Sequence, residues 1–116
     1  MSITRINRGP RMSQIVIHGD TVYLAGQVAL DAPGESVAAQ TASALARIDG
    51  LLGEAGTSKS KILAATIWIT DMGTFDEMNG VWDAWIDPEN PPARACVEST
   101  LAAPQFAVEI GITAAK

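Results

Sequence analysis

The feature of this sequence that most constrains its fold is a repeated change in the spacing of its apolar residues. Residues 15–18 and 21–24 are two short runs rich in β-branched and aromatic side chains, and Gly19 and Asp20 lie between them. Turn residues between two such runs indicate a β-hairpin. We expect the second strand to continue to residue 30, because a Pro-Gly pair follows shortly after it.

The spacing then changes to three and four residues. Over residues 36–55 this pattern predicts an amphipathic helix, which Gly56 is suited to end. Residues 62–70 are apolar on both faces, so we expect a strand that is largely covered on both sides.

A second helix is predicted to begin at Thr74, because the run from Thr74 to Glu77 matches the capping box. Prolines from residue 88 onwards would end this helix. Two final strands, residues 93–101 and 106–114, complete the order ββαβαββ. This order predicts an α+β fold in which two helices are grouped with a mostly antiparallel sheet.

Composition limits the class of protein. A length of 116 residues fits one domain, residues 1–116. The chain is 47% hydrophobic and 18% charged, against about 25% charged in typical domains, and this balance argues against disorder. The low charged fraction also suggests that another subunit covers some apolar surface.

Several classes of function are excluded by the same counts. The net charge of −5 lacks the basic footprint of non-specific nucleic-acid binding. A single cysteine, Cys96, rules out an intramolecular disulfide, and a single histidine, His18, leaves no His/Cys cluster for zinc. No apolar run is long enough to span a membrane, and residues 1–10 contain no signal-peptide core. We therefore expect a cytoplasmic protein that binds neither nucleic acid nor membranes.

Other conspicuous residues have ordinary structural interpretations. Residues 53–60 come within one residue of a phosphate-binding P-loop, but they follow a helix and precede a strand, which reverses the order that a P-loop needs. Trp82 and Trp85 lie on the apolar stripe of the second helix and Trp68 lies in an apolar strand, so we expect packing roles for all three. His18 lies at the hairpin turn, where we expect it to be solvated rather than catalytic.

The most informative stretch is the strand that begins at residue 93. Arg94, Cys96 and Glu98 alternate along it and share one face. A guanidinium in the middle of a strand needs polar partners if it is buried. A turn near residue 103 would pair this strand with the last one and place Glu109 opposite Glu98, although a slip of one residue would reverse the facing.

These side chains have two interpretations. In the first, Arg94 holds a carboxylate through two hydrogen bonds and Glu109 positions or deprotonates a water molecule, while Cys96 shapes the pocket with its backbone amide and small side chain. In the second, Arg94 forms an internal ion pair with Glu98 or Glu109. The residues alone favour neither interpretation.

Two groups of motifs, one at each end of the chain, occur together. The C-terminal group is Pro92-Ala93-Arg94-Ala95-Cys96-Val97-Glu98 followed by Val108-Glu109-Ile110. The other motifs are Gly9-Pro10, Ser13-Gln14, Val22-Tyr23-Leu24-Ala25-Gly26-Gln27 and Asn79. Their combination resembles the reactive-intermediate deaminase (YjgF) family, over roughly residues 8–114.

The resemblance implies a chorismate-mutase-like, ferredoxin-like α+β fold with two helices on one face of a mixed sheet. It also implies a homotrimer with clefts between neighbouring subunits. Members with the full set of motifs hydrolyse reactive imines and enamines, such as 2-aminoacrylate, to 2-keto acids and ammonia without a metal or organic cofactor. The catalytic residues would be Arg94, which holds the substrate carboxylate, and Glu109, which orients the attacking water. The other substrate-binding positions would be Gly26, Gln27, Cys96, Asn79 and Met12.

Two positions depart from the family pattern. Met12 stands where the family usually has tyrosine, and Ala25 stands where it usually has serine. Both replacements remove a hydroxyl group from the expected cleft, and the methionine makes its lip more apolar. The alternative to a deaminase is therefore a non-catalytic protein that binds or senses a small carboxylate-bearing metabolite on the same trimeric fold.

Overall fold

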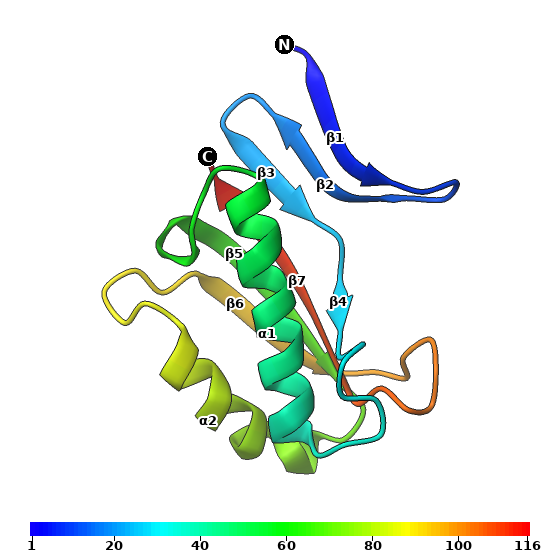
Figure 1. Cartoon of the computed structure of the whole chain (residues 1–116). Helices are drawn as coiled ribbons and strands as arrows, with labels where there is room; N and C mark the ends of the chain where they lie inside the picture. The colour runs from blue at the N-terminus through cyan, green and yellow to red at the C-terminus, as the bar shows by residue number, and fades with distance from the viewer.

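The computed structural model describes residues 1–116 as a seven-stranded β-sheet with two α-helices on one face (Figure 1). The strands are β1 (Ile3–Arg8), β2 (Ser13–His18), β3 (Thr21–Leu24), β4 (Gln27–Val28), β5 (Ile62–Ile69), β6 (Ala93–Glu98) and β7 (Val108–Ala115). The helices are α1 (Val37–Glu54) and α2 (Phe75–Trp85), and the 3-10 turns η1 (Lys59–Lys61) and η2 (Met72–Thr74) precede β5 and α2. The predicted α+β class is confirmed. Neither helix combines the length and the apolar character that crossing a membrane requires.

The strands lie in the order β1-β2-β3-β7-β5-β6, and β4 pairs with β7. All pairs are antiparallel except β5 with β6, which α2 connects. The prediction that the last two strands form a hairpin is wrong, because β5 lies between them and β6 is at the edge of the sheet. The alternation along β7 gives the physical reason. One face of β7 is wholly apolar (Val108, Ile110, Ile112 and Ala114), so this strand gains most by being central, whereas the corresponding face of β6 carries the charged Arg94 and Glu98.

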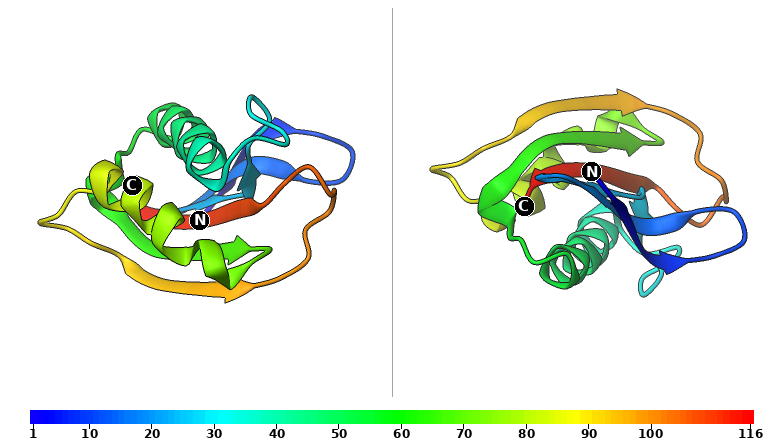
Figure 2. Two further views of the ribbon diagram at one scale, coloured as in Figure 1. Left: turned by 90° about the horizontal axis from the view of Figure 1, so that it is seen from below. Right: turned by 90° about the horizontal axis from the view of Figure 1, so that it is seen from above.

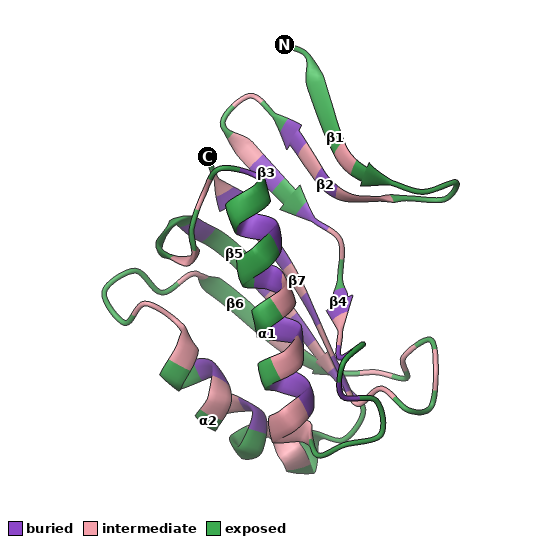
Figure 3. Ribbon diagram, viewed as in Figure 1, coloured by how far each residue is buried: buried purple, intermediate pink, exposed green.

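Helix α1 covers the centre of the sheet and contributes a continuous stripe to the core. The side chain of Ser36 caps its first turn by accepting a hydrogen bond from the Ala39 N–H at 3.1 Å. Its apolar stripe, which includes Leu45, Ile48 and Leu52, is buried in the same cluster as the inner faces of β5 and β7 (Figure 3). The helix predicted over residues 36–55 is confirmed, and residues 53–60 connect a helix to a strand as expected.

The start of α2 differs from the prediction. Thr74 makes no capping hydrogen bond to α2; its hydroxyl instead donates to the carbonyl oxygen of Asp71 at 2.6 Å, because Thr74 belongs to the turn η2. Glu77 does not reach back to its own helix either. Its Oε2 accepts a hydrogen bond from the Ala38 N–H at 2.8 Å, at the first turn of α1. The capping-box prediction is therefore wrong, although the helix that it located is present.

The N-terminal strands contain one confirmed element and two that the pattern does not predict. The hairpin of β2 and β3 is present, with Ile15 paired to Leu24 and Ile17 to Val22. Strand β1 adds an unpredicted and mostly exposed edge to it (Figure 3). The strand expected from residue 21 to residue 30 is interrupted after β3, so that β4 is a separate short strand beside β7.

The second face of the sheet points away from both helices and is uncovered in the chain (Figure 2). We call it the open face. Along β5, buried residues on the helix side alternate with partly exposed residues on the open face. The expectation that this strand is covered on both sides is therefore wrong for a single chain. Tyr23 and Val97 also lie on the open face and are 47% and 43% exposed, which is unusual for large apolar side chains in a sheet.

Candidate active site

Glu109 and Gly26 lie against each other on the open face. Glu109 alternates with buried neighbours along β7, so its side chain points away from the helices. A Cβ atom added to Gly26 would lie 3.0 Å from Cδ and 3.3 Å from Cγ of Glu109, and closer still to Oε2. Only glycine leaves room for the carboxylate at this point. The structure thus brings these two predicted site residues together.

Gln27 follows Gly26, but its side chain points to the helix side and is 3% exposed. Its Nε2 donates to Gln14 Oε1 at 2.8 Å and to the Ala25 carbonyl oxygen at 3.0 Å. Its Oε1 accepts a hydrogen bond from Arg47 Nε at 3.2 Å. The protein itself therefore uses the amide of Gln27, which holds the backbone beside Gly26 in place.

Arg94 lies on the opposite, helix-covered side of the sheet, near the start of β6. Its guanidinium carbon is 5.9 Å from the ring centroid of Phe75 and 5.3 Å from that of Trp82, both on α2. Contacts of this length are cation–π interactions, which hold the guanidinium against the helix. Glu98 accepts a hydrogen bond from the Met72 N–H at 2.9 Å, and Glu109 points to the open face. The interpretation of an internal ion pair of Arg94 is therefore wrong.

Asn79 and Cys96 lie on the same side of the sheet as Arg94. Asn79 is one helical turn from both Phe75 and Trp82, and its Oδ1 is buried without a hydrogen-bond partner. Cys96 packs against the core, and burial raises the pKa of its thiol, an effect that the charge of Arg94 partly offsets. The thiol is protonated near neutral pH, which does not suit a nucleophile.

The predicted site residues therefore fall into separate groups within one chain. Arg94, Cys96 and Asn79 form a group on the helix side, which we call the arginine group. Gly26 and Glu109 form a second group on the open face, which we call the glutamate group. Strand β5 separates β6 from β7, so the two groups do not converge in one chain.

The strand register separates Glu98 from Glu109, and Met12 and His18 lie outside both groups. Trp68 lies opposite Glu109, and Ile69 lies opposite Glu98, so the prediction that the two glutamates face each other is wrong. Met12 belongs to neither group; it is 45% exposed in the loop between β1 and β2. His18 is exposed at the turn between β2 and β3, where the sequence predicts it.

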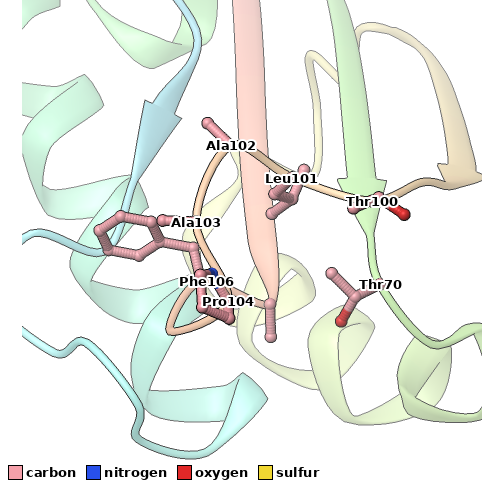
Figure 4. A pocket seen from close by; sticks show the side chains of 8 residues that line it. Thr70, Thr100, Leu101, Ala102, Ala103, Pro104 and Phe106 are labelled. Atoms are coloured by element: carbon pink, nitrogen blue, oxygen red, sulfur yellow. The ribbon is translucent and has the colours of Figure 1, made fainter.

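Sequence reasoning missed two features. The first is the role of Phe75 and Trp82 as a platform for Arg94; their spacing of seven residues is a signal for one helical face, but it is also the signal of ordinary core packing. The second is a cavity of about 290 Å³ beside the start of β7 (Figure 4). Its lining residues are Thr70, Thr100, Leu101, Ala102, Ala103, Pro104, Phe106 and Ala107. The signal for it was a loop of small and apolar residues where polar residues are usual.

The structure contains no group of three or more His, Cys, Asp or Glu side chains that could hold a metal ion. The charged groups at the two sites are the guanidinium of Arg94 and the carboxylate of Glu109. A guanidinium binds carboxylates and phosphates, and a half-buried carboxylate can accept a proton from water.

Comparison with known proteins shows which family has this sequence pattern. Residues 3–116 match the sequence profile of the family described as endoribonuclease L-PSP. A RutC family protein of Haemophilus ducreyi is 43% identical over 97% of this chain and 96% of its own length. A RutC family protein of Escherichia coli is also 43% identical, over 99% of each chain.

Solved structures show the same similarity. A member of the YjgF protein family from Neisseria meningitidis superposes with a TM-score of 0.96 and 47% identity, over 100% of this chain and 96% of that one. A member of the YjgF/YER057c/UK114 family from Mycobacterium tuberculosis gives a TM-score of 0.89 and 30% identity, over 99% of this chain and 100% of that one.

Proposed function

The chain belongs to the endoribonuclease L-PSP family, and from this premise we propose that it hydrolyses imines and enamines that carry a carboxylate, such as 2-aminoacrylate, to 2-keto acids and ammonia. The observation that carries the proposal is that Arg94 contacts aromatic rings and has no carboxylate partner in its own chain. In a chain with a net charge of −5, this exposed guanidinium rests on aromatic rings rather than on a carboxylate of its own chain. Such a cation is available for the carboxylate of a ligand.

Cleavage of RNA is the less favoured activity for this chain. A polyanion would have to approach a protein with a net charge of −5. The only histidine, His18, is exposed at a turn on the far side of β3 from the glutamate group. A small monocarboxylate needs only the local charge of Arg94.

The proposed reaction uses Glu109 as the base. The oxygen of a water molecule attacks C2 of the protonated imine while the Glu109 carboxylate takes one of its protons, which gives a neutral carbinolamine. Glu109 returns this proton to the amine nitrogen, the C–N bond breaks, and ammonia leaves. The hydroxyl oxygen becomes the carbonyl of the keto acid as Glu109 takes the hydroxyl proton, which ammonia then accepts to form ammonium. An enamine first takes a proton from solvent on C3 to become the protonated imine. Arg94 holds the carboxylate throughout.

We infer that a complete site combines two copies of the chain, as in the homotrimer that the family resemblance implies. Within one chain Arg94 and Glu109 lie on opposite faces of the sheet, with β5 between their strands. A substrate of a few carbon atoms cannot reach both. Arg94 of one copy and Glu109 of a neighbouring copy can meet in an intersubunit cleft, and the uncovered open face supplies apolar surface for such an association.

The direct test measures keto-acid and ammonia release from freshly generated 2-aminoacrylate. We expect Arg94→Ala to raise KM by tens of fold or more, because charge-assisted hydrogen bonds to the carboxylate are lost. Glu109→Gln should lower kcat while leaving keto-acid binding within a few fold. Equal rates for wild type and Arg94→Ala would refute the role of Arg94, and no acceleration by wild type would refute the enzyme.

Mixing variants tests the two-copy site. Arg94→Ala and Glu109→Gln chains are each impaired, but after subunit exchange a site can pair Arg94 from one variant with Glu109 from the other. In random trimers roughly a quarter of the intersubunit sites would be complete. Recovery of activity on mixing supports the shared site. A mixture as inactive as its parts, under conditions where exchange is verified by mass spectrometry, contradicts it.

The residues at positions 12 and 25 favour one other function, the binding of a small carboxylate without catalysis. Met12 and Ala25 bring no hydroxyl group to the cleft, so fewer hydrogen bonds are available to the reacting nitrogen. A non-catalytic protein that binds a small carboxylate would use the same Arg94. It would show a keto-acid-dependent rise in Tm that Arg94→Ala abolishes, together with no turnover of 2-aminoacrylate.

A further inference from the structure

Arg47 connects helix α1 to the segment of chain that contains Gly26. This half-buried arginine lies on α1, and its Nε donates a hydrogen bond to Gln27 Oε1 at 3.2 Å. A guanidinium only donates hydrogen bonds, so the oxygen of the Gln27 amide must face Arg47 and the NH₂ group must face the other way. Arg47 therefore fixes which way round the Gln27 amide lies.

The Gln27 amide in turn holds the chain between β3 and β4. Its Nε2 donates to the Ala25 carbonyl oxygen at 3.0 Å and to Gln14 Oε1 at 2.8 Å. The Ala25 N–H donates to the Gln14 carbonyl oxygen at 2.9 Å. Both backbone polar groups of Ala25 thus have fixed partners. Because Gln27 is 3% exposed, a lost hydrogen bond here would leave a polar group buried without replacement by water.

The Ala25 carbonyl group sets the direction of the next N–H. It belongs to the peptide unit that also contains the Gly26 N–H, and this unit is trans. In a trans peptide the C=O and the N–H point in opposite directions. The carbonyl accepts from the Gln27 side chain on the helix side, so the Gly26 N–H points to the open face. The Glu109 side chain lies against Gly26 on that face.

We propose that Arg47 is a positioning residue for the glutamate group: through the Gln27 amide, it keeps the Gly26 N–H directed to the point that the Glu109 carboxylate faces. The inference rests on the proposed function, because it takes Glu109 to be the base. A donor and an acceptor at one point hold a water molecule in a defined orientation, since its oxygen accepts from Gly26 and its proton is donated to Glu109. Arg47 acts through Gln27 and belongs to neither residue group.

Substitutions of Arg47 test this role in the assay of keto-acid release from 2-aminoacrylate. Arg47→Leu leaves the Gln27 oxygen without its donor, so the amide is free to turn over. We expect kcat to fall by roughly tenfold, because small displacements of reacting groups have large effects on rate. KM should stay within twofold, since Arg94 still holds the carboxylate. Arg47→Lys retains a donor and should restore kcat to within threefold of wild type.

Gln27→Glu separates the orientation of the amide from the contact with Arg47. The carboxylate of the variant still accepts from Arg47, and more strongly, but in its ionised form it cannot donate to the Ala25 carbonyl oxygen. We expect this variant to lower kcat by at least tenfold while KM again stays within twofold. A wild-type kcat in Gln27→Glu would show that the orientation of the Ala25–Gly26 peptide has no effect on the reaction, and it would overturn the proposal.

Ser36→Ala is the matched control for stability. It removes the hydrogen bond from the Ala39 N–H to Ser36 Oγ at the first turn of the same helix, and that bond does not involve Gln27. Its Tm should fall by a few degrees, as that of Arg47→Leu should, but its kcat should stay within twofold of wild type well below Tm. If Ser36→Ala lowers kcat as much as Arg47→Leu does, the effect of Arg47 is a general loss of stability and the proposal is overturned.

NMR of the ¹⁵N-labelled chain gives a readout that does not need turnover. Arg47→Leu should speed hydrogen exchange of the Gln27 side-chain NH₂ by at least tenfold and shift the Gly26 amide resonance, and Ser36→Ala should do neither. Unchanged signals in Arg47→Leu, or a wild-type kcat, would overturn the role of Arg47. If these signals change as expected but wild type does not turn over 2-aminoacrylate, the proposed function is overturned and Arg47 stands as the residue that orients Gly26.

Discussion

The contact between Gly26 and Glu109 permits a substitution that affects activity and stability differently. All three heavy atoms nearest to a Cβ on Gly26 belong to the side chain of Glu109, and none belongs to the backbone. Gly26 is not among the glycines with positive φ, so alanine meets no backbone strain there. The variant Gly26→Ala can therefore be accommodated only by moving the Glu109 carboxylate.

The expected magnitudes follow from these contacts. Moving the side chain to a strained rotamer costs about 0.5–1.5 kcal/mol, and replacing glycine with alanine returns about 0.4–1 kcal/mol through the unfolded state. The free energy of unfolding should therefore change by less than about 1 kcal/mol, or roughly 5 °C in Tm. If Glu109 is the base, its displacement should lower kcat by roughly 100-fold.

The assay combines thermal unfolding with keto-acid release from 2-aminoacrylate. Gly80→Ala is the matched control, because nothing lies within 4 Å of a Cβ at that position, and it should keep full activity. A double-mutant cycle sharpens the test. In a Glu109→Ala background the contact is absent, so Gly26→Ala should cause no further loss of activity. Full activity in Gly26→Ala, or a further loss in the double variant, would refute the reasoning.

Three further outcomes follow from the structure. Gly80→Ala should raise the free energy of unfolding by about 1 kcal/mol, measured by urea denaturation, because the helix interior gains a better helix former with no clash; a loss of stability would mean that α2 is packed differently there. Gln40→Leu should lower the free energy of unfolding by about 2 kcal/mol, since the Ala107 N–H loses its acceptor, and an unchanged urea midpoint would contradict that role. Burial raises the pKa of the Cys96 thiol, so less thiolate is present at a given pH, and iodoacetamide should react with it more slowly than with free cysteine at pH 8. Because the charge of Arg94 lowers this pKa, Arg94→Ala should slow the reaction further. A faster reaction in the variant would contradict this electrostatic effect of Arg94.

Local patterns in the sequence were sufficient for the elements but not for their order in the sheet. The helical period over residues 36–55 and the hairpin of β2 and β3 depend on neighbouring residues, and both are confirmed. The partner of β6 depends on which strand gains most by being central. Deciding this requires comparing the apolar burial that β6 and β7 would each gain at the centre of the sheet, and the sequence of one strand alone does not provide that comparison.

The candidate site could likewise be predicted only in part. The motifs identified Arg94 and Glu109 as site residues. The face of the sheet on which each side chain lies depends on the order of the strands, which neighbouring positions in the sequence do not determine. Gly26 illustrates what could be inferred in part. A glycine before Gln27 is visible in the sequence, whereas its reason, the carboxylate of Glu109 lying across it, exists only after β4 pairs with β7.

Each of the two residue groups is organised by its own part of the fold. The rings of Phe75 and Trp82 hold Arg94 on the helix side, and the hydrogen bonds of Gln27 hold the backbone beside Gly26, under Glu109. Two aromatic rings restrict Arg94, and the Gly26 backbone limits the space open to Glu109, so both side chains lose less conformational entropy when a substrate binds. If two copies share the site, each therefore contributes a prearranged half. Substitutions under Arg94 should then change KM for the carboxylate, and substitutions around Gly26 should change kcat, because each half can be disturbed without the other.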